Sequence, residues 1–493
     1  MVTPEPVSSN YLIFSDVHLG ADLVQHVRPW TVSRLKQVAR IDRDLASMLD
    51  FYRENRDPDR PWRLVIAGDL VDFIGMSIAP AASTPPADLT DEERLFGLGS
   101  TCEHAALKMR AVARRHGLVF QRLAAFVAEG HSLIIVRGNH DIDFYWETAQ
   151  QAFVEALVEC MPGLADDAVA LERFRARIEF HGWFYYEEGL LYVEHGHQFD
   201  AMCSYDHPLA PLMPHDKRRL CWSFSDILLR AVARPTPGLT SEGHEKWKMH
   251  DYLRLAASLG LIGGFQLAYR YFSAVLRALR RWRSHLSHKT RDIRAEQERR
   301  LEEVARRARV GVDKLRAVAA LWPAPVTRGM MRVLRSVHLD RIVIGGAIGM
   351  ISAALVLMLP VEWWIPCACA LVGAGVAYLV WSNRQRLLDL DPKQAMRKGA
   401  GRIAQLFDAR FIVMGHTHDP LAERIDDRAT YVNLGNWGID DLDDAAHEDA
   451  PRTHLVLRWI DGQLRAEFCR WDRDRGPLPQ PLPSGVSGST GLG

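Results

Sequence analysis

Five short segments of the chain each carry two or more side chains of the kinds that bind divalent cations. They are Asp16 with His18, Asp69 with Asp72, Asn139 with His140 and Asp141, His195 with His197, and His416 with His418. Carboxylate, imidazole and amide oxygen without thiolate suit ions such as Mn²⁺, Fe²⁺ or Zn²⁺. A single His after a strand is more often structural, but five such segments together indicate one metal centre with room for two ions.

A short apolar run precedes each of these segments. The runs are Tyr11–Phe14, Leu64–Ala67, Leu133–Val136, Leu190–Val193 and Phe411–Met414. Continuous apolar runs of this length predict buried strands, and helical patterns such as Val32–Tyr52 and Cys102–Glu129 lie between some of them. The sequence therefore predicts an α/β fold. Ligand sites in such folds lie beyond the carboxyl ends of the strands, so we expect the five segments to meet there.

Ordinary turn chemistry is the alternative explanation, because Gly, Asp and Asn are common in loops. That explanation accounts for any one segment by itself. It does not account for metal-binding side chains after every one of the five runs.

The polar segments together resemble the signature of the calcineurin-like metallophosphoesterases, in that family's order. The motifs are D-x-H at Asp16 and His18, G-D-x-x-D from Gly68 to Asp72, G-N-H-D from Gly138 to Asp141, His195 with Gly196, and G-H-x-H from Gly415 to His418. The resemblance runs from Tyr11 to Trp437 with a long insertion excluded. It implies a four-layer α-β-β-α sandwich.

The resemblance also implies a role for each residue of the site. Asp16, His18, Asp69 and His418 would bind one metal ion, and Asp69, Asn139, His195 and His416 the other, with Asp69 as the bridge. Two divalent ions, with manganese favoured over iron or zinc, would activate water to attack phosphorus. His140 would protonate the leaving oxygen while Asp141 orients its imidazole, and Asp72 would support a ligand His.

Within the family, the chain is similar to the UDP-2,3-diacylglucosamine pyrophosphohydrolases of lipid A synthesis. That group also has a helical lid before G-H-x-H, and it ends in a segment similar to Tyr431–Trp437. This chain has His140 where the group reads Arg, and His197 where it reads Asp. We expect a phosphoester or pyrophosphate hydrolase, with a lipid-linked or nucleotide-lipid substrate. The alternatives are a phosphatase or phosphodiesterase for a soluble substrate, and a non-catalytic membrane scaffold.

The insertion between the fourth and fifth segments has a different character. From Arg270 to Arg341 it carries nineteen Lys or Arg and seven Asp or Glu, interleaved with apolar residues at helical spacing. Two uncharged segments follow, Ile342–Leu359 and Trp363–Trp381, each about 27 Å long as a helix. They predict a membrane hairpin over residues 342–381. A buried hairpin or a dimer interface is the alternative.

Flanking charges predict the orientation of that hairpin. Arg332 and Arg335 precede it and Arg384 and Arg386 follow it, which places both ends in the cytoplasm. The N-terminus lacks the pattern of a secretory signal before Tyr11. We therefore expect a multi-pass protein on the cytoplasmic side of the inner membrane.

Composition limits the remaining possibilities. The 493 residues include 61 basic and 61 acidic side chains, so we expect no nucleic-acid partner. Seven scattered cysteines without C-x-x-C argue against a disulfide framework and a structural zinc site. We expect the phosphoesterase domain to be divided into residues 1–200 and 401–472, with a helical insertion over 201–400 and a disordered tail over 473–493.

Overall fold

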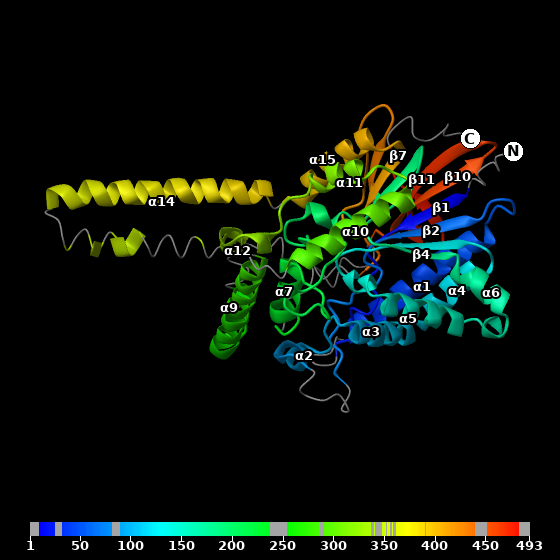
Figure 1. Cartoon of the computed structure of the whole chain (residues 1–493), viewed down its shortest axis with the longest axis horizontal. Coiled ribbons are helices and arrows are strands. Elements are labelled where there is room, and N and C mark those ends of the chain that lie inside the picture. The colour runs from blue at the N-terminus through cyan, green and yellow to red at the C-terminus, as the bar shows by residue number, and fades with distance from the viewer. Residues whose placement is uncertain are drawn as a thin grey trace.

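The structure is a computed structural model with two β-sheets and helices on both outer sides (Figure 1). It describes residues 9–24, 32–80, 89–236, 254–255, 257–285, 290–336, 340, 348–351, 353–354, 357, 361–389, 391–438 and 451–482.

The first sheet has seven strands in the order β12-β11-β10-β1-β2-β3-β4. The strands are β1 (Asn10–Phe14), β2 (Trp62–Ala67), β3 (Ser132–Val136), β4 (Ile178–His181), β10 (Thr453–Ile460), β11 (Gln463–Asp472) and β12 (Gly476–Pro479). Strands β1 to β4 are parallel, and β10 pairs with β1 in the antiparallel direction. Three of the predicted strands are thus confirmed as the parallel centre of this sheet.

The second sheet has five strands in the order β5-β6-β7-β9-β8. They are β5 (Phe184–Glu187), β6 (Leu190–Glu194), β7 (Ala409–Met414), β8 (Leu421–Arg424) and β9 (Thr430–Asn433). Strands β6, β7 and β9 are parallel to one another. The other two predicted strands, β6 and β7, are therefore confirmed as neighbours, although more than two hundred residues separate them in the sequence.

Alternating side chains along the strands build the layers of the molecule. Leu12 and Phe14 of β1 face a helical layer, whereas Tyr11 and Ile13 pack between the two sheets. This alternation follows from the two-residue period of a strand. The helices over the first sheet are α1 (Val32–Glu54), α3 (Cys102–Arg115), α4 (Gly117–Ala128) and α5 (Glu147–Glu159).

The second sheet has its own helical cover. Its helices are α10 (Arg291–Ala308), α11 (Val312–Ala319) and α15 (Pro392–Leu406). Ile412 and Met414 of β7 pack against this layer, while Phe411 and Val413 pack between the sheets. The arrangement is the α-β-β-α sandwich that the family resemblance implies.

Part of the insertion packs in a smaller second core, which also includes Ile74, Ile142 and Tyr145 from the loops after β2 and β3. It contains α7 (Phe224–Leu228), the π-helical turn η5 (Leu229–Ala233), α9 (Gly260–His285), the 3₁₀ turn η8 (Val326–Arg328) and α12 (Met330–Ser336). Helix α14 (Val361–Asp389) extends away from the sandwich (Figure 1). Two further helices are short, α2 (Asp91–Phe96) and α6 (Ala168–Arg175).

The predicted membrane hairpin is not supported by the structure. Much of Ile342–Leu359 lies outside the described residues, and Trp363–Trp381 lies within α14. Among the residues that the structure describes, no helix combines the length and the apolar character needed to cross a bilayer.

The C-terminal tail also differs from its prediction at one point. Strand β12 falls within residues 473–493 and pairs with β11 in the antiparallel direction. Its two prolines, Pro477 and Pro479, are tolerated because β12 is the edge of the sheet. Residues beyond 482 lie outside the described part of the chain.

Candidate metal centre

Backbone hydrogen bonds tie the strand-end loops together. His18 N donates to the carbonyl oxygen of Asp69 at 2.9 Å, which joins the loops after β1 and β2. Gly415 N donates to the carbonyl oxygen of His195 at 3.0 Å, which joins the loops after β6 and β7. Trp437 N donates to Asp16 O at 2.9 Å, so a segment that follows the second sheet is fixed to the first. The loops of both sheets thus converge on one place.

Strained backbone is concentrated in these loops. In the described part of the chain, seven residues other than glycine have positive φ, and five of them belong to the predicted metal ligands. The five are Asp16, His18, Asp69, His416 and His418, with φ between 53° and 68°. A left-handed conformation costs about 1–2 kcal/mol for a residue with a side chain. Such strain is retained mainly where function requires a particular side-chain position.

Glycines of the sequence motifs leave the space that the ligand side chains occupy. A Cβ at Gly68 would collide with the imidazole of His195, and one at Gly138 would collide with the carboxylate of Asp69. A Cβ at Gly415 would likewise meet the side chains of Asp16 and Ser15. The glycines before Asp69, Asn139 and His416 are therefore part of the site, because they let the loops approach one another.

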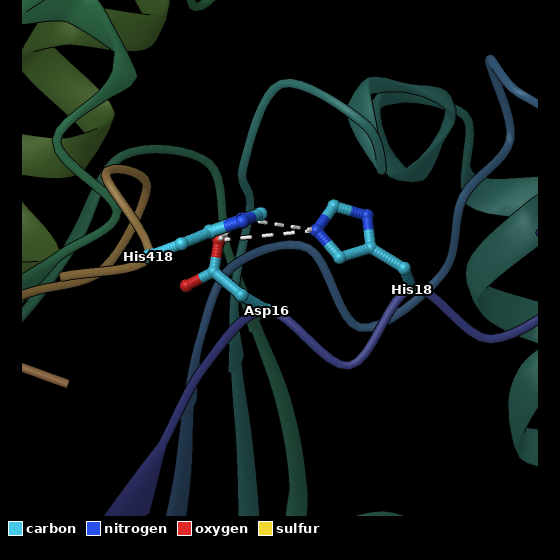
Figure 2. A group of neighbouring side chains, drawn as sticks. All are labelled: Asp16, His18 and His418. Atoms are coloured by element: carbon cyan, nitrogen blue, oxygen red, sulfur yellow. Dashed lines mark hydrogen bonds and ion pairs between the residues drawn. The ribbon is translucent and has the colours of Figure 1, made fainter. Parts of the chain in front are cut away.

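Asp16, His18 and His418 form the first group of possible metal ligands (Figure 2). One ligand atom from each residue lies within 4.8 Å of the others. Asp16 Oδ1 is 3.2 Å from His418 Nε2, and the two Nε2 atoms of His18 and His418 are 3.4 Å apart. A carboxylate oxygen and two imidazole nitrogens directed at one point suit a divalent cation.

Asp69, His195 and Asn139 form the second group. His195 Nε2 lies 3.0 Å from Asp69 Oδ2 and 3.2 Å from Asn139 Oδ1, while His195 Nδ1 donates to Ala67 O at 2.9 Å. That donation directs the Nε2 lone pair into the site. All three side chains direct possible ligand atoms at one another, and a cation bound there would take the place of the proton on His195 Nε2.

The two groups lie next to each other. Asp16 Oδ1 is 4.0 Å from His195 Nε2, and possible ligand atoms of Asp16, Asp69 and His195 all lie within 4.8 Å of one another. The residues present therefore fit a pair of neighbouring metal ions.

His416 is placed beside this second group. Its ring centroid is 5.3 Å from that of His195, and its backbone N–H points at the carboxylate of Asp16. Its Nε2 is 3.1 Å from Asp200 Oδ2, which leaves Nδ1 as the nitrogen for a metal. The sequence reasoning missed Asp200, although Asp200 lies only five residues after His195 and could have been found as a continuation of that polar segment.

The partner of His140 differs from the prediction. His140 Nδ1 is 2.7 Å from Asp72 Oδ1, so Asp72 orients the imidazole. Asp141 instead accepts hydrogen bonds from the backbone N–H groups of Leu70 and Gly138. Asp141 therefore joins the loops after β2 and β3, because its carboxylate accepts hydrogen bonds from both of them.

Arg234 extends this pair into a chain of three groups. Its guanidinium lies 3.1 Å from Asp72 Oδ2, while Asp72 Oδ1 contacts His140. Arg234 follows η5 in the insertion, 162 residues from Asp72. No local motif marks it, so sequence reasoning could not have selected it.

The electrostatics of the site favour positive charge. Burial lowers the pKa of His140, but the carboxylates of Asp72 and Asp69 outweigh it and raise that pKa to about 10. Burial likewise opposes a charge on His195, yet Asp69 and Asp16 raise its pKa to about 9. Burial raises the pKa of Asp72, but His140 and Arg234 hold it well below its usual value.

His197 occupies a neighbouring position. It is buried, and its ring centroid lies 5.5 Å from that of His195 and 5.9 Å from that of Tyr205. Burial, with His195 and His416 nearby, lowers its pKa well below the usual value, so it is neutral. Among the described residues it belongs to none of the groups with metal-ligand spacing.

Comparison with known proteins agrees with this geometry. Residues 9–254 match the family model of the calcineurin-like phosphoesterases. No curated protein matches the chain. The finer resemblance to the UDP-2,3-diacylglucosamine pyrophosphohydrolases is not supported by these comparisons.

Proposed function

We propose that the protein cleaves phosphoester or pyrophosphate bonds with two divalent ions. Residues 9–254 match the calcineurin-like phosphoesterases, and this match indicates a metal-dependent phosphoesterase. One observation carries this proposal: Asp16, Asp69 and His195 from loops of both sheets present their ligand atoms to one point. His140 stands beside them as a proton donor, since its ring centroid is 4.6 Å from that of His18.

The residues divide into two sets of ligands. Asp16, His18 and His418 would hold one ion, and Asn139, His195 and His416 the other, with Asp69 between them. When bound, two such ions lower the pKa of water and withdraw charge from the phosphoryl oxygens. We favour manganese, since oxygen and imidazole ligands suit it and thiolate is absent from both sets.

His140 would supply the proton for the leaving group. Asp72 holds Nδ1, so Nε2 is the nitrogen available to the substrate. As the oxygen of water forms a new P–O bond and its proton is released to solvent, the bond to the leaving oxygen breaks and that oxygen would take the proton of His140 Nε2. Asp72 and Arg234 keep the ring oriented through this transfer.

We also propose that the substrate is lipid-linked, a nucleotide-lipid included, and that the protein works on the cytoplasmic side of the inner membrane. The support is the basic insertion and the apolar surface of α14, where Trp363, Val376 and Trp381 are exposed. The alternative is a soluble phosphomonoester or phosphodiester, which the same metal centre would also hydrolyse.

Turnover of two substrates tests these proposals. The purified protein should hydrolyse bis-p-nitrophenyl phosphate with Mn²⁺ and lose that activity with a chelator, and a lack of metal-dependent turnover would contradict the hydrolase. A nucleotide-diphospho-lipid in detergent micelles should be cleaved with a higher kcat/KM than the soluble ester. Preference for the soluble ester would favour the alternative substrate.

A further inference from the structure

Helix α9 presents a continuous apolar stripe to solvent. Leu261, Phe265, Tyr269 and Phe272 are 92%, 82%, 73% and 57% exposed, and Leu276 continues the row. Their spacing of three or four residues places them on one face of the helix. The stripe is about 22 Å long from Leu261 to Leu276. Large apolar side chains that are exposed in a contiguous row usually mark an interaction surface.

The opposite face of α9 fixes the helix to the protein. Leu267, Ala274, Val275 and Ala278 are buried in the core that α9 shares with α7, η5 and α12. One face of α9 is therefore already used for packing. The exposed stripe is a second apolar face, so the fold alone does not account for it.

The charge of α9 identifies what can cover the stripe. The helix from Gly260 to His285 contains five Arg and no Asp or Glu. Arg277 lies near the C-terminal end of the stripe and pairs with Glu92 at 3.3 Å, and Arg280 is exposed one turn beyond Leu276. Aromatic and aliphatic side chains flanked by cations are typical of helices that lie in the interface of an anionic bilayer.

A second copy of the chain fits the stripe less well. Helix α9 has no Asp or Glu, so a second α9 helix packed against the stripe would offer no carboxylate of its own to the exposed Arg280. The charge of α9 therefore does not favour a second copy, whereas anionic headgroups attract arginine.

We propose that the exposed face of α9 docks on an anionic lipid bilayer. The inference deepens the proposed membrane location and is independent of the metal chemistry. Helix α9 would lie along the surface rather than across it, because its other face remains packed against the protein. Helix α12 contacts both α9 and α14. Helices α9 and α14 lie on the same side of the sandwich (Figure 1).

Vesicle flotation of the full chain tests this proposal. The vesicles contain phosphatidylcholine alone or phosphatidylcholine mixed with phosphatidylglycerol. We expect the wild type to float with the anionic vesicles, and the triple variant Phe265→Ser, Tyr269→Ser, Phe272→Ser to bind them at least about tenfold more weakly. The matched control is Leu95→Ser with Val169→Ser, which removes exposed apolar side chains from α2 and α6 and should float like the wild type.

Other outcomes separate the possible failures. Equal flotation of the triple variant and the wild type would overturn the role of α9 while leaving a membrane location in place. A different result would be a wild type that fails to bind vesicles and is oligomeric, with only the triple variant monomeric. That result would assign the stripe to self-association and overturn the proposal. Turnover of bis-p-nitrophenyl phosphate should be equal in all variants, and its absence in every one would contradict the hydrolase instead.

Discussion

The metal centre and helix α9 depart from the usual distribution of residues in opposite directions. At the strand ends, the carboxylates of Asp16 and Asp69 are buried. On α9, large apolar side chains such as Phe265 are exposed. Burying charge and exposing apolar surface both cost free energy in a protein by itself. Each region is therefore best explained by something that binds there, a pair of cations in one case and a lipid surface in the other.

The two regions also differ in how they are held. The strand-end loops are fixed by backbone hydrogen bonds and by strained residues, which gives each ligand atom one position. Helix α9 is fixed along one face, by apolar packing and by the ion pair of Arg277 with Glu92. The groups of a reaction centre must be held in fixed positions, whereas a helix that binds a fluid lipid surface needs no fixed position for each side chain.

The largest expected effect comes from the bridging carboxylate. Asp69→Asn should lower kcat for bis-p-nitrophenyl phosphate by about a thousandfold, because one charge shared by both sets of ligands is lost. Steady-state assays at saturating Mn²⁺ measure the change. Asp313→Asn, which alters an exposed carboxylate on α11, is the matched control. Activity within a few fold of the wild type would show that the strand-end loops are not the reaction centre.

Removal of the metal ions should have an effect on stability that is similar, in free energy, to the effect of Asp69→Asn on kcat. Ions that bind only the folded protein stabilise it by about 4 kcal/mol at a thousandfold excess over Kd. A chelator should therefore lower the Tm of the wild type, and added Mn²⁺ should restore it. Calorimetry of Asp69→Asn provides the comparison, since its Tm should respond much less. Equal responses would place the metal outside the strand-end loops.

Loss of the carboxylate next to His140 should have a smaller effect. Because Asp72 raises the pKa of His140, Asp72→Asn lowers that pKa and moves the high-pH decline of kcat to lower pH. For a substrate with a poorly acidic leaving group, kcat should fall by about a hundredfold.

A p-nitrophenyl ester serves as the control for this effect, because its leaving oxygen needs little protonation. Arg234→Gln should lower kcat less than Asp72→Asn, in the same direction. An unchanged pH profile in both variants would contradict the assignment of His140 as the acid.

The smallest expected effect concerns a histidine of the core. His454 is fully buried beside Tyr52, and burial lowers its pKa to about 3. As the pH falls below about 6.5 the unfolded chain takes up a proton that the folded protein does not, so stability falls. At pH 5 this costs about 2 kcal/mol. Urea unfolding at pH 7 and pH 5 should show that the free energy of unfolding falls less in His454→Gln than in the wild type. An equal fall in the two proteins would contradict the role given to His454.

The sequence contained enough information to find the elements that carry the site. A buried strand and the ligands that follow it are local in the chain, so Asp16, Asn139 and His195 could be selected from short patterns. The partners that complete the site are not local. Asp72 and Arg234 meet through an insertion, and no spacing in the sequence records that contact.

Apolar segments were harder to interpret. A period of three or four residues shows that α9 has an apolar face, but burial on one side and exposure on the other depend on the packing of distant elements. In the same way, β12 forms because β11 offers an edge, although Pro477 and Pro479 suggest a tail without structure.

The most direct test of the central claim is the number of metal ions bound per chain. Wild-type protein and Asp69→Asn should be incubated with Mn²⁺, freed of excess ions by gel filtration and analysed by elemental mass spectrometry. We predict two ions per chain in the wild type and one or none in Asp69→Asn. Substoichiometric metal in the wild type, or equal contents in the two proteins, would contradict a two-ion centre bridged by Asp69.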